Sequence, residues 1–128
     1  MSENNYTEKR VRAITALGIR ICARLNEEIL KLGFGVGAIP AVHWEAADFT
    51  LKRDPYSGEE SVEGIWHDAD GQRIGMILFH AGGNFFSEYD VARPHPGNER
   101  WFVEAVSAWG SGDILKAEAR LLPALIEA

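Results

Sequence analysis

Four histidines are the side chains best suited to bind a metal ion or to move a proton: His43, His67, His80 and His95. Neutral imidazole is the commonest metal ligand, and its pKa lies close to neutral pH. No HxH, HxxxH or HExxH spacing brings two of them together by local geometry. A chain reversal at Asp70-Gly71 separates His67 from His80 by roughly 20 Å, at about 3.3 Å per strand residue. We therefore predict no metal site and no cofactor.

Cys22 and the acidic segment 67–71 offer less chemistry than their residue types suggest. Cys22 is the only cysteine and lies in an apolar helical pattern, which favours an inert buried thiol over a nucleophile. The segment HDADG resembles the start of a calcium loop, but an apolar strand follows where an EF-hand needs further oxygen ligands. Asp68 is expected to point away from His67 and to pair with Arg73, so these residues do not form an acid–base pair. The sequence therefore favours a protein without catalytic activity over an enzyme.

Length, composition and charge limit the possible classes of protein. The 128 residues fit one α+β domain spanning 1–128, and 46% hydrophobic with 25% charged residues is typical of a globular chain. The net charge of −6 disfavours nucleic-acid binding. The first ten residues lack the apolar core of a signal peptide, and no apolar run approaches the roughly 18 residues of a membrane span. We expect a cytoplasmic protein that binds no membrane.

The first element that could position functional residues is an amphipathic helix from Thr7 to about Lys31. Thr7 is the predicted N-cap, and glycines 33, 35 and 37 are predicted to end the helix. These glycines follow a helix and lack a GKS or GKT sequence, so they do not predict a phosphate loop. Gly18 shares the stripe of apolar residues at helical spacing, which comprises Val11, Ile14, Ile21, Leu25 and Leu32.

The middle of the chain, residues 42–91, is predicted to form an antiparallel meander. Residues 42–53 are strand-like, with a slip at Ala46-Ala47 that suggests a bulge or a late strand start, and 54–59 is a turn. Asp70-Gly71 predicts a two-residue type I′ turn. That turn places Trp66 opposite Gly75, Val62 opposite Phe79, His67 opposite Ile74 and Asp68 opposite Arg73. A second two-residue turn, centred on either Gly82-Gly83 or Gly83-Asn84, places Phe86 on the same face as Phe79.

The C-terminal part of the chain is predicted to be helical. The prolines in 92–97 exclude a helix and indicate a connector. Asn98 is a candidate N-cap for a helix that ends at the glycines of 110–112 and places Trp101, Ala105 and Trp109 on one side. Residues 113–121 contain good helix formers but also alternate like an edge strand; we favour helix, with Pro123 opening a last helical turn. The expected fold is a two-layer sandwich: the N-terminal helix, an antiparallel meander of about four strands and one or two C-terminal helices.

This architecture predicts a candidate binding surface on the sheet. If both helices cover one face, the opposite face needs another cover, and residues 113–128 are the alternative to an intermolecular contact. On that face we expect an aromatic patch with an acidic rim that docks a protein partner or a second copy of the chain. The residues of this predicted surface are Trp66, Ile77, Phe79, Phe86, Glu88 and Asp90.

A second hypothesis belongs to a different functional class. The protein would be a small enzyme or a small-ligand binder with a pocket between the sheet and the helices. The residues that would line this pocket are His80, Tyr89 and Trp101. A close cluster of these side chains in a cavity would favour this hypothesis over the binding surface.

Overall fold

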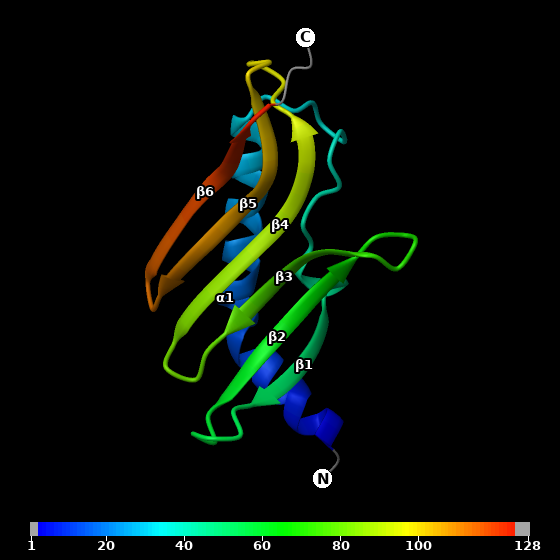
Figure 1. Ribbon diagram of the computed structural model, residues 1–128. Coiled ribbons are helices and arrows are strands. Elements are labelled where there is room, and N and C mark those ends of the chain that lie inside the picture. Colours follow the sequence, from blue (N-terminus) through cyan, green and yellow to red (C-terminus); the bar gives the residue numbers. More distant parts are fainter. Residues whose placement is uncertain (1–2, 125–128) are drawn as a thin grey trace.

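A computed structural model describes residues 3–124 as one long helix against a six-stranded antiparallel sheet. The strands follow the chain in the order β1-β2-β3-β4-β5-β6, so each pairs with its sequence neighbour. Figure 1 shows α1 behind the sheet, crossing one of its two faces. The elements are α1 (Glu3–Lys31), the 3-10 helix η1 (Trp44–Ala46), β1 (Asp48–Arg53), β2 (Glu60–His67), β3 (Arg73–Phe79), β4 (Asn84–Pro94), β5 (Trp101–Ser111) and β6 (Ile114–Pro123).

The predicted N-terminal helix is confirmed, but it begins earlier than expected. It starts at Glu3, so Thr7 lies inside the helix and is not its N-cap. At the other end, Gly33 adopts a φ of 93° and donates its N–H to the Leu30 carbonyl, 3.0 Å away. Glycine reaches this left-handed conformation without steric cost, which explains why the helix ends there.

The predicted C-terminal helices and the four-strand meander are wrong. The segment from Asn98 forms β5 instead of a helix, and Asn98 accepts a hydrogen bond from the Arg100 N–H in the turn before it. Residues 113–121 supply β6 at the edge of the sheet. Their two-residue alternation places Leu115, Ala117 and Ala119 toward the core. Burial of this alternating set against α1 outweighs the helix preference of the individual residues.

The first hairpin has the predicted register over most of its length. Val62 lies opposite Phe79 and Trp66 opposite Gly75, as expected. The turn itself differs, because Gly71 has a positive φ of 81° and Asp70 does not, so it is not type I′. The Asp68 carboxylate accepts N–H groups from Asp70 and Gln72, each at 2.9 Å. A register shift after Trp66 then places Arg73 opposite His67, so the predicted pair of Asp68 with Arg73 is wrong.

The second turn is longer by one residue than predicted, and this difference reverses the two faces of β4. The His80 N–H donates to the Asn84 carbonyl at 2.8 Å, so three residues, 81–83, form the loop. Phe79 therefore lies opposite Phe85 instead of on the same face as Phe86. Because side chains alternate along a strand, this single residue reverses the faces of β4 relative to β2 and β3. Trp66 and Tyr89 consequently share one face, with ring centroids 6.0 Å apart.

The face beneath α1 holds the core, and Trp44 fills the space between the helix and the sheet. Its indole N–H donates to the Thr15 hydroxyl at 3.3 Å, and its ring lies 4.5 Å from that of Phe49. A Cβ on Gly18 would come within 2.2 Å of the Trp44 ring, so the glycine on the helix stripe leaves room for it. The strand after Trp44 starts only at Asp48, which agrees with the late start suggested by the sequence.

Candidate interaction surface on the open face

The sheet face opposite α1, here called the open face, carries a continuous apolar row. Ile65 lies opposite Met76, and two residues further along β3 Leu78 lies opposite Phe86, which in turn lies opposite Trp109. The row therefore steps along β3 as it crosses β2, β3, β4 and β5. Within residues 3–124 no helix or strand is layered over these side chains (Figure 1). They are half-buried by their neighbours in the sheet, and Phe86 remains 38% exposed. We call these five residues the open-face patch.

Charged side chains surround the open-face patch. On the β6 side, Arg120 donates to Glu88 at 2.8 Å and to Glu104 at 3.4 Å, and on the β1 side Lys52 lies 2.9 Å from Glu63. Burial raises the pKa of Asp90, while the nearby Arg73 opposes this shift. The pattern of an apolar centre with a charged rim is typical of protein–protein interfaces.

The six residues predicted as the binding surface do not form one surface. Trp66, Ile77 and Phe79 lie beneath α1 with exposures of 2%, 0% and 6%. Phe86, Glu88 and Asp90 lie on β4 with their side chains on the opposite face. The three-residue loop at 81–83 accounts for this correction, because it changes which residues of β3 and β4 share a face.

The three residues of the alternative ligand pocket are also separate. His80 follows the last residue of β3, whereas Tyr89 lies opposite Gly75 near the first residue of β3. Tyr89 is buried in the core, and this burial raises its pKa. Trp101 starts β5 opposite Pro123, at the end of the sheet remote from His80 (Figure 1). The strand register therefore keeps these three side chains from forming one cluster.

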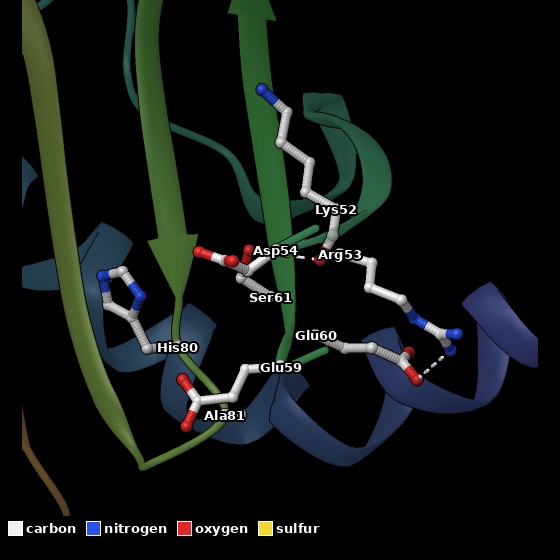
Figure 2. A pocket seen from close by; sticks show the side chains of 8 residues that line it. All are labelled: Lys52, Arg53, Asp54, Glu59, Glu60, Ser61, His80 and Ala81. Atoms are coloured by element: carbon white, nitrogen blue, oxygen red, sulfur yellow. Dashed lines mark hydrogen bonds and ion pairs between the residues drawn. The ribbon is translucent and has the colours of Figure 1, made fainter. Parts of the chain in front are cut away.

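His80 instead lines a shallow polar pocket between the β1–β2 turn and the end of β3 (Figure 2). Its volume is about 250 Å³. Arg53 donates to Glu60 across 2.8 Å. The Asp54 carboxylate accepts the backbone N–H groups of Tyr56 and Ser57, and these hydrogen bonds lower its pKa. Both interactions stabilise the β1–β2 turn. The lining residues are Lys52, Arg53, Asp54, Glu59, Glu60, Ser61, His80 and Ala81.

The remaining candidates for chemistry are His67 and Cys22. In the described chain, no group of three or more His, Cys, Asp or Glu side chains is placed to hold a metal ion. His67 hydrogen-bonds through Nδ1 to Asp48 at 3.1 Å. Cys22 is 4% exposed, which confirms its predicted burial, and burial raises the pKa of its thiol to about 12. Among residues 3–124, no helix has the length and apolar character that crossing a membrane would require.

Comparisons with known proteins add no assignment: no protein-family model matches the chain, and no curated protein or solved structure is significantly similar to it. The residues of the open-face patch therefore come from geometry alone. From the sequence, Trp109 was predicted to lie in a C-terminal helix, and Ile65, Met76 and Leu78 were not among the residues of the predicted surface. The signal that could have located them is the alternation of β3, which carries apolar residues on both faces.

Proposed function

We propose that this protein is a non-catalytic, cytoplasmic binding protein that docks a protein partner through the open-face patch. The observation that carries the proposal is the apolar row from Ile65 to Trp109 on a sheet face with no second layer among the described elements. Contiguous apolar patches of this kind are uncommon on monomers and mark interaction sites. The single, deeply buried thiol of Cys22 suits a reducing compartment such as the cytoplasm.

The charge of the rim specifies the chemistry of the partner. Glu88 and Glu104 share one cation, Arg120, while Asp90 lies near Arg73 and Glu63 pairs with Lys52, so the rim has more carboxylates than cations. The chain as a whole carries a net charge of −6. A partner that presents an apolar ridge bordered by Lys or Arg would match both the patch and its rim. Nucleic-acid phosphates would be repelled by the same carboxylates.

Site-directed photo-crosslinking in the native cell tests this proposal. A photoreactive amino acid is placed at Phe86 in one variant and at Ala16, on the exposed side of α1, in a control. We expect a discrete protein adduct from the Phe86 position only. The captured protein is then purified and its Kd for the wild-type chain is measured. Leu78→Lys and Phe86→Glu should each weaken binding at least about tenfold, because each places a charge in the apolar contact.

Two controls distinguish a specific interface from non-specific hydrophobic binding. Ala16→Lys should leave the Kd unchanged, and higher ionic strength should weaken binding if the acidic rim contributes. Near-UV circular dichroism establishes that the variants keep their tertiary packing. The proposal is rejected if both positions give the same adducts, or if the purified partner binds the Leu78→Lys and Phe86→Glu variants as tightly as the wild type.

A further inference from the structure

The strand β6 forms one edge of the sheet and has a free side along its length. It pairs with β5 from Ile114 to Pro123, and in the described chain no strand pairs with its other side. The opposite edge strand, β1, spans only six residues, against ten in β6. An edge strand presents unpaired N–H and C=O groups that can bind another strand. The length of β6 makes it the larger of the two edges.

The side chains of β6 alternate between the two sheet faces in a way that restricts its partners. Lys116, Glu118 and Arg120 lie on the open face, while Ala117 and Ala119 lie toward the core. Charged side chains on an edge ordinarily keep other strands away, because like charges would meet. They admit a strand whose charges have the complementary order.

A second copy of β6 has that complementary order in an antiparallel arrangement. A two-fold axis perpendicular to the sheet keeps the faces matched, so it has to pass midway between one residue and the same residue of the second copy. An axis at Glu118 would place Glu118 against Glu118 and Lys116 against Arg120, which are like charges. An axis at Ala119 places Glu118 against Arg120 twice, which are opposite charges. Alanine at the axis adds no bulk between the strands.

The register centred on Ala119 is favoured over the one centred on Ala117, which also pairs opposite charges. About Ala119, Leu121 lies against Ala117 and Leu122 against the stem of Lys116. Leu121 and Leu122 are 39% and 42% exposed on the single chain. About Ala117, both leucines would lie opposite the β5–β6 turn and gain no strand partner. The longer overlap therefore buries more apolar surface and pairs more backbone.

We propose that two copies of this chain pair antiparallel through β6, centred on Ala119, to form one continuous twelve-stranded sheet. This self-association uses the edge of the sheet and leaves both open faces accessible, so it is independent of the proposed docking function. In such a dimer Glu118 gains Arg120 of the second copy as an ionic partner, while Arg120 keeps its contacts with Glu88 and Glu104 in its own chain.

Sedimentation velocity over a concentration series tests the dimer. The wild type should sediment at twice the chain mass of 14.2 kDa. Glu118→Lys places like charges opposite one another, and Ala119→Pro distorts the free edge, so both should sediment as monomers with an unchanged far-UV spectrum. Thr50→Lys, an added charge on the other edge strand, should remain dimeric. If Ala119→Pro fails to fold, the test rests on Glu118→Lys, which changes an exposed side chain.

Disulfide trapping tests the register. In a Cys22→Ser background, Ala119→Cys places two thiols on the two-fold axis, where facing Cα atoms lie about 4.5–5.5 Å apart, within disulfide range. Ala117→Cys thiols would be separated by several residues and should not react. A wild type that stays monomeric, a dimer that persists in Glu118→Lys, or trapping at position 117 instead of 119 would each overturn the proposal.

Discussion

The two faces of this sheet are built from the same strands but differ in how their apolar residues are held. On the face that α1 covers, the ring of Trp44 packs against Phe79 and that of Trp66 against Tyr89. Gly18 leaves space for Trp44, and Gly75 leaves space for Trp66. On the open face, the five residues of the open-face patch lie side by side along the strand register, with ion pairs at their margin. Trp66, Ile77 and Phe79 are almost fully buried, whereas Phe86 on the open face is 38% exposed, so we expect the covered face to contribute most of the folding free energy.

Truncation of one tryptophan on each face gives the largest expected contrast. Trp66→Ala removes a ring that is 2% exposed, packs edge-on against Tyr89 and donates its indole N–H to the His43 carbonyl at 2.8 Å. Loss of such a ring costs about 3–5 kcal/mol of unfolding free energy. Trp109→Ala on the open face should cost only about 1 kcal/mol, because that ring is half-buried. Urea unfolding measures both values, and equal losses of stability would contradict the expected difference between the two faces.

A methyl group added under Trp44 should give the next largest effect. Gly18→Ala gains about 1 kcal/mol of helix propensity, but its Cβ would stand 2.2 Å from the indole ring. Overpacking of this kind costs about 1–3 kcal/mol, so we expect a net loss of stability in thermal or urea unfolding. Gly35→Ala is the control: no atom lies within 4 Å of its Cβ, and its stability should stay within about 0.5 kcal/mol of the wild type. A stabilised Gly18→Ala variant would show that the helix is not tightly packed on the sheet.

The smallest effect is a pH dependence from Asp90 on the open face. Burial raises the pKa of Asp90 in the folded chain above its ordinary value of 3.8. A carboxyl group with a raised folded pKa favours folding at pH values below 3.8, and this contribution is lost as the pH rises through the folded pKa. Asp90→Asn should therefore be slightly more stable than the wild type at neutral pH, with the difference shrinking in acid. Glu59→Gln, on an exposed turn, controls for the loss of one negative charge. A neutral-pH loss of stability in Asp90→Asn alone would contradict this reasoning.

Features that depend on neighbouring residues in the chain were predictable from the sequence. The helix and its glycine stop, the Val62 to Phe79 register and the buried thiol of Cys22 each rest on residues close together in the chain, and each was predicted correctly. The candidate surface was assigned wrongly because it required the exact length of the loop at 81–83. Two- and three-residue loops use the same glycine-rich sequence, and a difference of one residue reverses a strand face.

The strand β4 contains a bulge that could not be predicted from the local sequence. Its pairing with β5 shifts between Asp90 and Arg93, and Ala92 adopts a left-handed φ of 48°. Alanine does not signal such a conformation as glycine does. Arg93 donates to the Ala38 carbonyl in the connector that follows α1, so contacts between distant segments accompany the bulge.

The sequence is enough to predict the amphipathic helix and most of the register of the first hairpin, because periodicity and turn residues act within a few positions. Long-range packing, in contrast, selects the strand conformation for β5 and β6 and the strand faces that meet α1. Those choices depend on burial against partners far away in the chain, which outweighs the small conformational preferences of single residues.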